Sequence, residues 1–346
     1  MTQDALSARL GSVPAPQVPS HPDVATWRPA TAADIDAIHT LMGAADPVDH
    51  PTWTTPREDI ADLFDLAEMD PARDMLLAED ADGTLLAYGE VLLHPSREGG
   101  ELTVYLSGTV HPAHRRRGIG ARLLAWQHAR GLERLAEGAA HLEDGGVSGE
   151  MKIYAEERNA GQRALAEAAG YQVERWFTSM VRDLADAPGI PTVPDGLEVV
   201  AYTHDRDLDA LEARNDAFRD HWGSRPTEPQ RWMQFVGGEF FRADLSRLVL
   251  DGGRIVAFCL ASVNEDDWET LGASNSYIDL IGVVRSHRRR GLAPLVIANT
   301  LDAIRAAGLQ KAVLDVDTAS PTGANALYEG LGFAATERSI ALVMHV

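Results

Sequence analysis

Two short basic segments, about 170 residues apart, have the composition of a phosphate-binding turn. Residues 114–120 have the sequence His-Arg-Arg-Arg-Gly-Ile-Gly, and residues 287–293 have the sequence His-Arg-Arg-Arg-Gly-Leu-Ala. A glycine-rich turn that opens a helix leaves several backbone N–H groups unpaired, and the helix dipole adds a partial positive charge there. Gly118 and Gly120, or Gly291 and Ala293, let a pyrophosphate approach the backbone closely. The repeat therefore predicts two phosphate sites.

Each turn lies between an apolar strand and an amphipathic helix. Residues 102–110 and 121–135 are the expected strand and helix of copy one, and residues 277–284 and 295–307 are those of copy two. In both copies a hairpin precedes this unit, and a strand, a helix and a closing strand follow it. This order predicts the α+β class, with a mixed α/β sheet and helices on both faces, built twice along the chain.

The length of 346 residues exceeds what one compact core usually supports. Residues 1–24 are rich in Pro and Ser and are expected to be a mobile tail or an arm lying over a domain. Residues 187–196 concentrate Pro and Gly, which is typical of a linker. We therefore expect an N-terminal domain at 25–186 and a C-terminal domain at 197–346.

The formal net charge of −21 bears on the partners of the chain. Such a charge repels nucleic acid and anionic membranes and attracts cationic substrates such as amines. An acidic surface that serves only solubility explains the same charge equally well. No stretch approaches the roughly 20 apolar residues of a membrane span, and the first residues lack a signal-peptide pattern. A cytoplasmic location is expected.

The single cysteine, Cys259, lies in the apolar run 255–260. It has no second cysteine with which to form an internal disulfide, and no basic residue beside it in the sequence would lower its pKa. We expect a buried strand residue rather than a nucleophile.

The pattern Arg-x-x-Gly-x-Gly/Ala after an apolar strand resembles the pyrophosphate loop of the GNAT acyl-CoA N-acyltransferases. A second family motif, a helix ending in Leu-Tyr-x-x-x-Gly-Phe, is matched by Leu-Tyr-Glu-Gly-Leu-Gly-Phe at 327–333. The resemblance covers nearly the whole chain beyond residue 24 and implies two tandem GNAT domains.

This resemblance implies that acetyl-CoA binds at the end of each strand, without a metal. Its pantetheine would pair with the backbone of Val110 and His111 in copy one, and of Val283, Val284 and Arg285 in copy two. Its diphosphate would lie on the two turns, formed by Arg115, Arg116, Arg117, Gly118, Ile119 and Gly120, and by Arg288, Arg289, Arg290, Gly291, Leu292 and Ala293. The arginines also fit a solvated basic patch or a nucleic-acid contact, which the net charge disfavours. One arginine per turn is expected to contact phosphate.

Tyr328 stands where the family places the tyrosine that protonates the departing CoA thiolate. Packing of its ring between helix and sheet is the alternative explanation. The aligned residue of copy one is Ala166. Copy one therefore lacks this acid.

Asp279 is the candidate base, or the anchor for an ammonium group, because many family members carry a carboxylate on this strand. Aligned on the arginines, it corresponds to Leu106 in copy one, and Tyr277, Asp279, Ile281 and Val283 are expected to alternate onto one face. A hydrogen-bonded carboxylate at a sheet opening is the alternative explanation. Copy two also departs from the family, because Ser320 and Pro321 stand where an Asn is often found, whereas copy one keeps Asn159.

The acceptor is expected at the loop after the first helix of copy two, where carboxylates and aromatic rings combine: Asp216, Phe218, Asp220, His221 and Trp222. That mixture suits a cationic ligand with an apolar portion. The four-residue spacing of Phe218 and Trp222 also fits ordinary core packing.

The expected function is acetyl-CoA-dependent N-acetylation of a small-molecule primary amine in the C-terminal domain, the N-terminal domain being degenerate. The chain is similar to the mycothiol synthases within this family in two respects: its first copy is degenerate and its second copy intact, and it has Asn-x-Ala-Phe-x-x-His at 215–221. Acetylation of a cysteinyl amine is thus a narrower alternative. A non-catalytic protein that binds CoA or another ligand is a second alternative, and catalysis in copy one a third. Either a monomer or a homodimer is compatible with the sequence.

Overall fold

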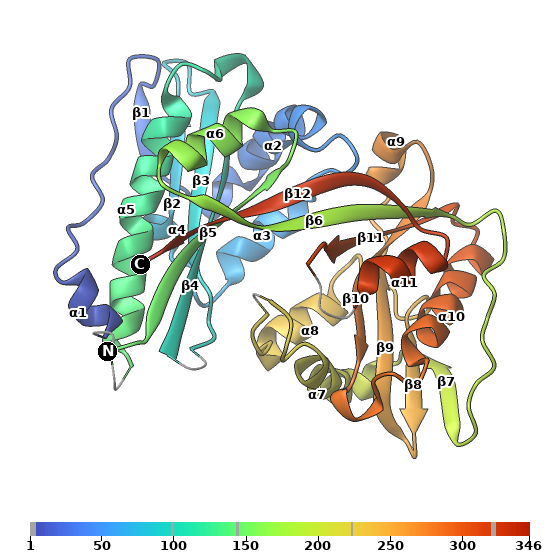
Figure 1. The fold of residues 1–346 in the computed structure, drawn as a ribbon. Coiled ribbons are helices and arrows are strands. Elements are labelled where there is room, and N and C mark those ends of the chain that lie inside the picture. Colours follow the sequence, from blue (N-terminus) through green and yellow to red (C-terminus); the bar gives the residue numbers. More distant parts are fainter. Residues whose placement is uncertain (1–4, 98–99, 143–144, 223, 320–322) are drawn as a thin grey trace. The chain divides into compact units, whose positions relative to one another are not determined.

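The computed structural model describes residues 5–97, 100–142, 145–222, 224–319 and 323–346. Ser320 and Pro321 lie outside the described residues. The chain forms two compact units, the first made of residues 1–176 and 338–346 and the second of residues 177–337. Each unit contains one of the two basic turns and one series of paired strands in mixed orientation (Figure 1).

The first unit has the sheet order β1-β2-β3-β4-β5-β12, in which only β4 and β5 run parallel. Its elements are α1 (Leu6–Leu10), β1 (Thr26–Pro29), α2 (Ile35–Asp49), α3 (Arg57–Asp65), α4 (Pro71–Asp74), β2 (Met75–Glu79), β3 (Leu85–Leu93), β4 (Glu101–Val110), α5 (Ile119–Ala140), β5 (Ser148–Glu156), α6 (Ala160–Ala168) and the start of β6 (Gln172–Asp183).

The second unit repeats this arrangement with the order β7-β8-β9-β10-β11-β6, in which only β10 and β11 run parallel. Its elements are β7 (Leu197–Ala201), α7 (Asp207–Ala217), α8 (Pro229–Gly237), β8 (Arg247–Asp251), β9 (Arg254–Ser262), α9 (Asp267–Leu271), β10 (Asn275–Val283), α10 (Leu292–Ala306), β11 (Lys311–Asp317), α11 (Ala324–Gly330) and the start of β12 (Ala334–His345).

Helices cover both faces of the strands in each unit. Successive strand residues point to opposite faces, so both sets of side chains are buried. On β9, Cys259 and Ala261 pack in a cluster with α10, whereas Phe258 and Leu260 pack in a cluster with α7 and α8. The first unit is built likewise, with α5 on one face and α2 on the other. The predicted α+β class, with a mixed sheet and helices on both faces, is confirmed.

The last strand of each half of the sequence lies in the other unit. Phe177–Asp183 of β6 pair with Lys311–Asp317 of β11, and Ser339–His345 of β12 pair with Glu150–Glu156 of β5. The Pro/Gly-rich residues 187–196 lie within the second unit. Each sheet is therefore completed by a strand from the distant half of the sequence.

The N-terminal arm packs against the first unit. Leu6 is fully buried in its core, and Arg9 donates hydrogen bonds to the carbonyls of Val147 and Val346. Farther along, Nε2 of His21 lies 2.8 Å from the carbonyl oxygen of Arg117, which belongs to the first basic turn. None of the helices in the described part of the chain combines the length and apolar character of a membrane span.

Candidate acyl-CoA sites

The two basic turns have the same backbone conformation. Arg116 and Arg289 take the left-handed conformation, with φ of 64° and 60°, and Gly118 and Gly291 follow with φ of 100° and 76°. A side chain larger than glycine seldom adopts this conformation, so its recurrence in both copies marks a specific requirement. In each turn an extended arginine precedes the left-handed one, and a left-handed glycine opens the helix. The unpaired N–H groups at the start of α5 and of α10 provide an anion-binding site there.

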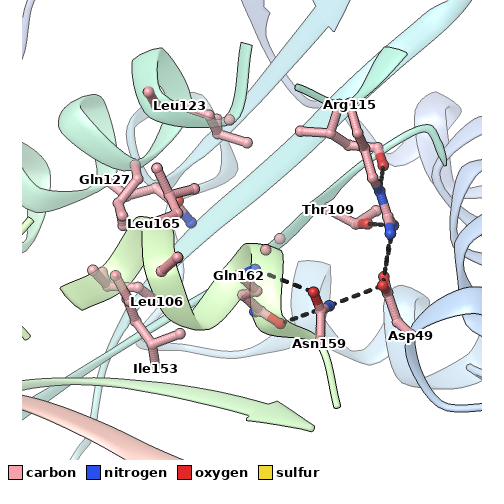
Figure 2. A pocket seen from close by; sticks show the side chains of 18 of the residues that line it. Asp49, Leu106, Thr109, Arg115, Leu123, Gln127, Ile153, Asn159, Gln162 and Leu165 are labelled. Carbon is pink, nitrogen blue, oxygen red and sulfur yellow. Dashed lines mark hydrogen bonds and ion pairs between the residues drawn. The ribbon is translucent and has the colours of Figure 1, made fainter. Parts of the chain in front are cut away.

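The first arginine of each turn is bound to a carboxylate of its own unit. Arg115 donates two 2.7 Å hydrogen bonds to Asp49 and one of 2.8 Å to the carbonyl of Val110 (Figure 2). Arg288 likewise donates to Asp220 at 3.0 Å and to the carbonyl of Ala217 at 2.8 Å. These two side chains attach the first turn to the C-terminal end of α2 and the second turn to that of α7.

The other arginines have different surroundings. The guanidinium groups of Arg116 and Arg289 have no hydrogen-bond or ion-pair partner among the residues that the structure describes, and Arg116 lines a cavity. Arg117 faces Asp23 of the N-terminal arm at 3.7 Å, and Arg290 lies near Asp251. The second arginine of each turn is thus the one whose charge is available to a phosphate.

Of the two residues after the glycine in each turn, the first is buried in the core and the second has at most a methyl side chain. Ile119 and Leu292 are 1% and 2% exposed and belong to the hydrophobic cores. A Cβ atom at Gly120 would lie 3.4 Å from Leu165 and 3.5 Å from Val110, which is ordinary contact, and Ala293 occupies the equivalent position in copy two. Only the backbone of these residues is placed to meet a ligand.

The strand before each turn leaves one edge open. The pairing of β4 with β5 ends at Tyr105, and that of β10 with β11 ends at Tyr277. The N–H groups of His111 and Val284 donate to the carbonyls of Leu86 and Val256 on the neighbouring antiparallel strand. The backbone N–H groups of Val110 and Val283 therefore point to the open edge, where an extended amide-containing chain can pair. The carbonyl groups of these two residues accept from Arg115 and Arg288 of the turns. The N–H of Arg285 instead donates to Asp216 at 2.8 Å.

Strand β10 carries a β-bulge that strand β4 lacks. The register of β9 with β10 shifts between Ile278 and Leu280, so Asp279 is the additional residue, whereas β3 and β4 pair without a shift from Ala87–Val110 to Leu93–Val104. The residue of copy two that is structurally equivalent to Leu106 is consequently Ile278 and not Asp279. Copy one lacks both the carboxylate and the residue position that carries it.

The bulge also corrects the predicted alternation. Ile281 and Val283 pack with the cluster of α10, as Ile278 does, whereas Leu280 packs with the cluster of α7 and α8. A bulge places one extra residue on a strand and reverses the facing of those beyond it. Tyr277 and Asp279 therefore do not share a face with Ile281 and Val283.

The Asp279 carboxylate accepts a 2.7 Å hydrogen bond from the hydroxyl of Ser262. Ser262 continues the series Phe258 and Leu260 on β9, so Asp279 faces the same side as α7 and α8. Burial raises the pKa of Asp279 to about 7, opposed by the hydrogen bond from Ser262. A carboxylate that exchanges a proton near neutral pH suits general base catalysis.

Tyr328 lies on α11 in the cluster on the α10 face, with its ring centroid 6.0 Å from that of Phe333. Burial, with a smaller contribution from Cys259, raises its pKa, so the phenol stays protonated at neutral pH. Its hydroxyl has no hydrogen-bond partner among the described residues. Packing and an acid role are compatible at this position. Cys259 is itself buried, as expected, and burial raises its thiol pKa to about 12.

The residues singled out for the acceptor fall into two groups. Asp216 and Asp220 bind the segment before the second turn: Asp216 accepts from the Arg285 N–H, and Asp220 accepts from the guanidinium groups of Arg285 and Arg288. Phe218 packs against Phe258 and beneath Arg214. His221 is exposed, and the ring of Trp222 lies 6.4 Å from that of Phe177. The structure thus connects the two aspartates to the turn through Arg285 and Arg288.

A cavity of about 440 Å³ lies in the first unit, beside the open edge of β4. Figure 2 shows Arg115, Asp49, Thr109 and Asn159 at one end and Leu106, Leu123, Ile153 and Leu165 at the other. Asn159 caps α6 by accepting from the Gln162 N–H and donates to Asp49 at 2.9 Å. Among the described residues, no group of three or more His, Cys, Asp or Glu is arranged to hold a metal ion.

Asp49, Ser262 and the bulge were missed by the sequence reasoning. The bulge had a signal, since Val110 follows Tyr105 by five positions and Val283 follows Tyr277 by six. Asp49 and Ser262 had none, because their partners are distant in sequence or on a different strand.

Comparison with known proteins gives a consistent result. The acetyltransferase (GNAT) family model matches residues 36–171 and 208–333. The chain is 30% identical over 320 residues to the mycothiol acetyltransferase of Salinispora tropica, which covers 87% of this chain and 89% of that protein. It is 31% identical over 260 residues to the mycothiol acetyltransferase of Thermobispora bispora, covering 73% and 78% respectively.

Two solved structures share the fold of nearly the whole chain. A GCN5-related N-acetyltransferase from Sphaerobacter thermophilus superimposes with a TM-score of 0.68 at 24% identity, covering 92% of this chain and 95% of that one. A tandem GNAT protein from the clavulanic acid biosynthesis pathway gives a TM-score of 0.65 at 16% identity, covering 92% and 98%. These similarities concern the fold alone.

Proposed function

The chain belongs to the acetyltransferase (GNAT) family and is an acyltransferase, and we propose that its second unit transfers an acetyl group from acetyl-CoA to a primary amine of a small molecule. The observation that carries this proposal is the asymmetry of the two copies. Only β10 has the bulge with Asp279, and only α11 has Tyr328, where copy one has an uninterrupted strand and Ala166.

The second turn suits the diphosphate of acetyl-CoA. Arg289 and Gly291 have the left-handed backbone of an anion-binding turn, and a Cβ at Gly291 would meet no atom within 4 Å, so the surface there is open. Val283 offers its backbone to the open edge, where the amides of the pantetheine would pair. Acetyl-CoA supplies the activated thioester, and the chain supplies its orientation and proton transfer.

In the proposed reaction, Asp279 takes a proton from the amine, directly or through water, and the free nitrogen lone pair attacks the thioester carbonyl carbon. A carbon–nitrogen bond forms and the carbon–sulfur bond breaks. Tyr328 gives its proton to the departing sulfur, and the attacking nitrogen loses its second proton to solvent, which reprotonates Tyr328. Because Asp279 lies on the α7/α8 face and Tyr328 packs on the α10 face, the two groups would serve opposite sides of the splayed strands.

The acceptor would enter on the face of Asp279. Tyr277 donates a 2.9 Å hydrogen bond to Asp315, and Ser179 donates to the same carboxylate. With His221 and Trp222, these groups provide carboxylates and rings for a cationic amine.

A cysteinyl amine is a second candidate acceptor, favoured by the name mycothiol acetyltransferase that the relatives at 30% and 31% identity carry. The test is release of free CoA from acetyl-CoA with a panel of amines that includes cysteinyl amines. Turnover with one amine, lost in Asp279→Asn, supports the proposal. Absence of turnover with every amine favours the alternative of a non-catalytic CoA-binding protein.

A further inference from the structure

The cavity of the first unit has two chemically different ends (Figure 2). One end consists of the basic turn, with Arg116, Gly118 and Gly120, and suits phosphate. The other end is lined by apolar side chains that are almost completely buried, among them Leu106, Leu123 and Ile153 at 3%, 4% and 5% exposure. A ligand that fills it carries a phosphate group at one end and an apolar group at the other.

The polar side chain of Gln127 lines the cavity beside Leu123. Its amide nitrogen donates to the carbonyls of Glu90 at 3.0 Å and Ser107 at 2.7 Å. Both amide hydrogens of Gln127 are thus bonded to backbone carbonyls. A ligand at this end of the cavity therefore needs no hydrogen-bond acceptor to satisfy them.

Ala166 enlarges this end of the cavity. In copy two the equivalent Tyr328 fills the space between α11 and the sheet with its ring, packed against Phe333. In copy one the side chain stops at Cβ, is 1% exposed and lines the cavity. The substitution that removes the acid also leaves apolar space where the thioester end of a bound CoA would lie.

We propose that this cavity holds an acyl-CoA whose acyl group is longer than acetyl, and holds it without consuming it. The inference rests on the proposed function only in assigning CoA to the basic turns. The diphosphate lies on the turn, the pantetheine on the edge of β4, and the acyl chain against Leu106, Leu123, Ile153 and Leu165. Copy one has neither the bulge carboxylate nor the tyrosine, so the thioester persists.

The affinity of the acyl chain follows from its burial. Each buried methylene contributes about 0.8 kcal/mol, which corresponds to about fourfold in the dissociation constant. Hexanoyl-CoA has four methylenes more than acetyl-CoA, so a tenfold or greater preference is expected even if only two of them are buried.

The test is calorimetric titration of the full chain carrying Gly291→Glu, which blocks the second turn, with CoA, acetyl-CoA, butyryl-CoA and hexanoyl-CoA. We expect the affinity to increase from acetyl to hexanoyl. Equal or weaker binding of the longer chains overturns the inference, and so does absence of binding. Turnover of the unsubstituted chain is measured separately, so failure here is distinguishable from failure of acetyl transfer in copy two.

Two variants locate the effect. Ala166→Phe fills the apolar end and is expected to abolish the preference for hexanoyl-CoA while CoA binds within about twofold of its former affinity. Ala168→Phe introduces the same ring on the exposed side of α6 and is expected to keep the preference. A preference that survives Ala166→Phe places the acyl chain elsewhere and contradicts the proposal. If Ala166→Phe does not fold, the acyl series alone decides.

Discussion

The hydroxyl of Ser262 donates a 2.7 Å hydrogen bond to Asp279, the residue by which β10 exceeds its neighbour β9 at the bulge. The bulge turns the Asp279 side chain to the face of Ser262, Tyr277 and Leu260, and the hydrogen bond fixes its carboxylate there. A one-residue difference between two otherwise matching strands thus distinguishes a copy with a positioned carboxylate from a copy without one.

The first prediction concerns pH. Because burial raises the pKa of Asp279 to about 7, the carboxylate is ionised and able to accept a proton only above that pH. We expect kcat/KM for the amine to rise tenfold per pH unit below about pH 7 and then to level. Asp279→Asn should lower kcat/KM roughly a hundredfold or more and remove this rise. Asp302→Asn, at a surface ion pair with Arg305 on α10, is the matched control and should keep it.

The second prediction concerns the proton given to the leaving thiolate. Tyr328→Phe keeps the packing against Phe333 and removes only the hydroxyl, so acetyl-CoA affinity should change little while kcat falls roughly a hundredfold. The check is steady-state kinetics across pH 6–9. Unchanged activity at all pH values would refute the acid role. Tyr202→Phe, at a buried tyrosine bonded to Asp207, controls for a general effect on stability.

The third prediction assigns the active copy. Gly291→Glu places a carboxylate at the second turn and should abolish turnover, whereas Gly118→Glu at the first turn should leave it. Both glycines have positive φ, so any side chain adds strain of about 1–2 kcal/mol. The alanine variants at the same positions share the strain without the charge and separate the two effects. Loss of turnover in Gly118→Glu alone, in a folded protein, would reassign the active unit to copy one.

Features with a local pattern could be predicted from the sequence. The turns, the hairpins and the order of strands and helices follow from glycines, apolar periodicity and turn residues. Even α8, which was missed, has such a signal, with Pro229 in its first turn and Trp232 and Val236 buried four residues apart. Its amphipathic pattern was readable.

Features that depend on distant partners could not be predicted. The ion pair of Arg115 with Asp49 joins residues 66 positions apart. The pairing of β12 with β5 depends on which sheet offers an edge, and the sequence of β12 is equally compatible with either unit. Asp220 was predicted to bind substrate because its segment combines carboxylates with aromatic rings. Its contacts with Arg285 and Arg288 arise only from the fold, so the sequence did not reveal them.

The fourth prediction concerns Glu90, a buried carboxyl group that accepts a hydrogen bond from the Tyr88 hydroxyl. Burial raises its pKa from 4.5 to about 7. Below pH 4.5 the carboxyl group is protonated in both the folded and the unfolded protein, so it does not lower the free energy of unfolding. Between 4.5 and 7 unfolding releases a proton, so stability falls as pH rises, by up to roughly 3 kcal/mol.

Glu90→Gln removes this dependence. The melting temperature of the variant relative to the unsubstituted chain should therefore increase from pH 5 to pH 8. Glu167→Gln, at a surface pair with Arg163, should show little change. A constant difference between Glu90→Gln and the unsubstituted chain at all pH values would contradict the assignment.

The fifth prediction concerns the exchanged strands. Ile340 and Leu342 of β12 are fully buried in the core of the first unit, although β5, the strand with which they pair, ends at Glu156, 184 residues before Ile340. Ile340→Ala should destabilise the first unit by about 2–5 kcal/mol, because it removes buried methyl groups and leaves a cavity. Ser339→Ala, one position earlier, should have little effect. Denaturant unfolding monitored by hydrogen exchange of β5 amides reports on this unit.

A fragment of residues 1–186 tests the same exchange more severely. It lacks the strand that pairs with β5, so it loses two core side chains and exposes an edge that favours aggregation. We expect it to be poorly folded and to be rescued when residues 334–346 are supplied, in the same chain or as a separate peptide. A fragment that is folded and monomeric without them would show that the sheet of the first unit is complete without β12.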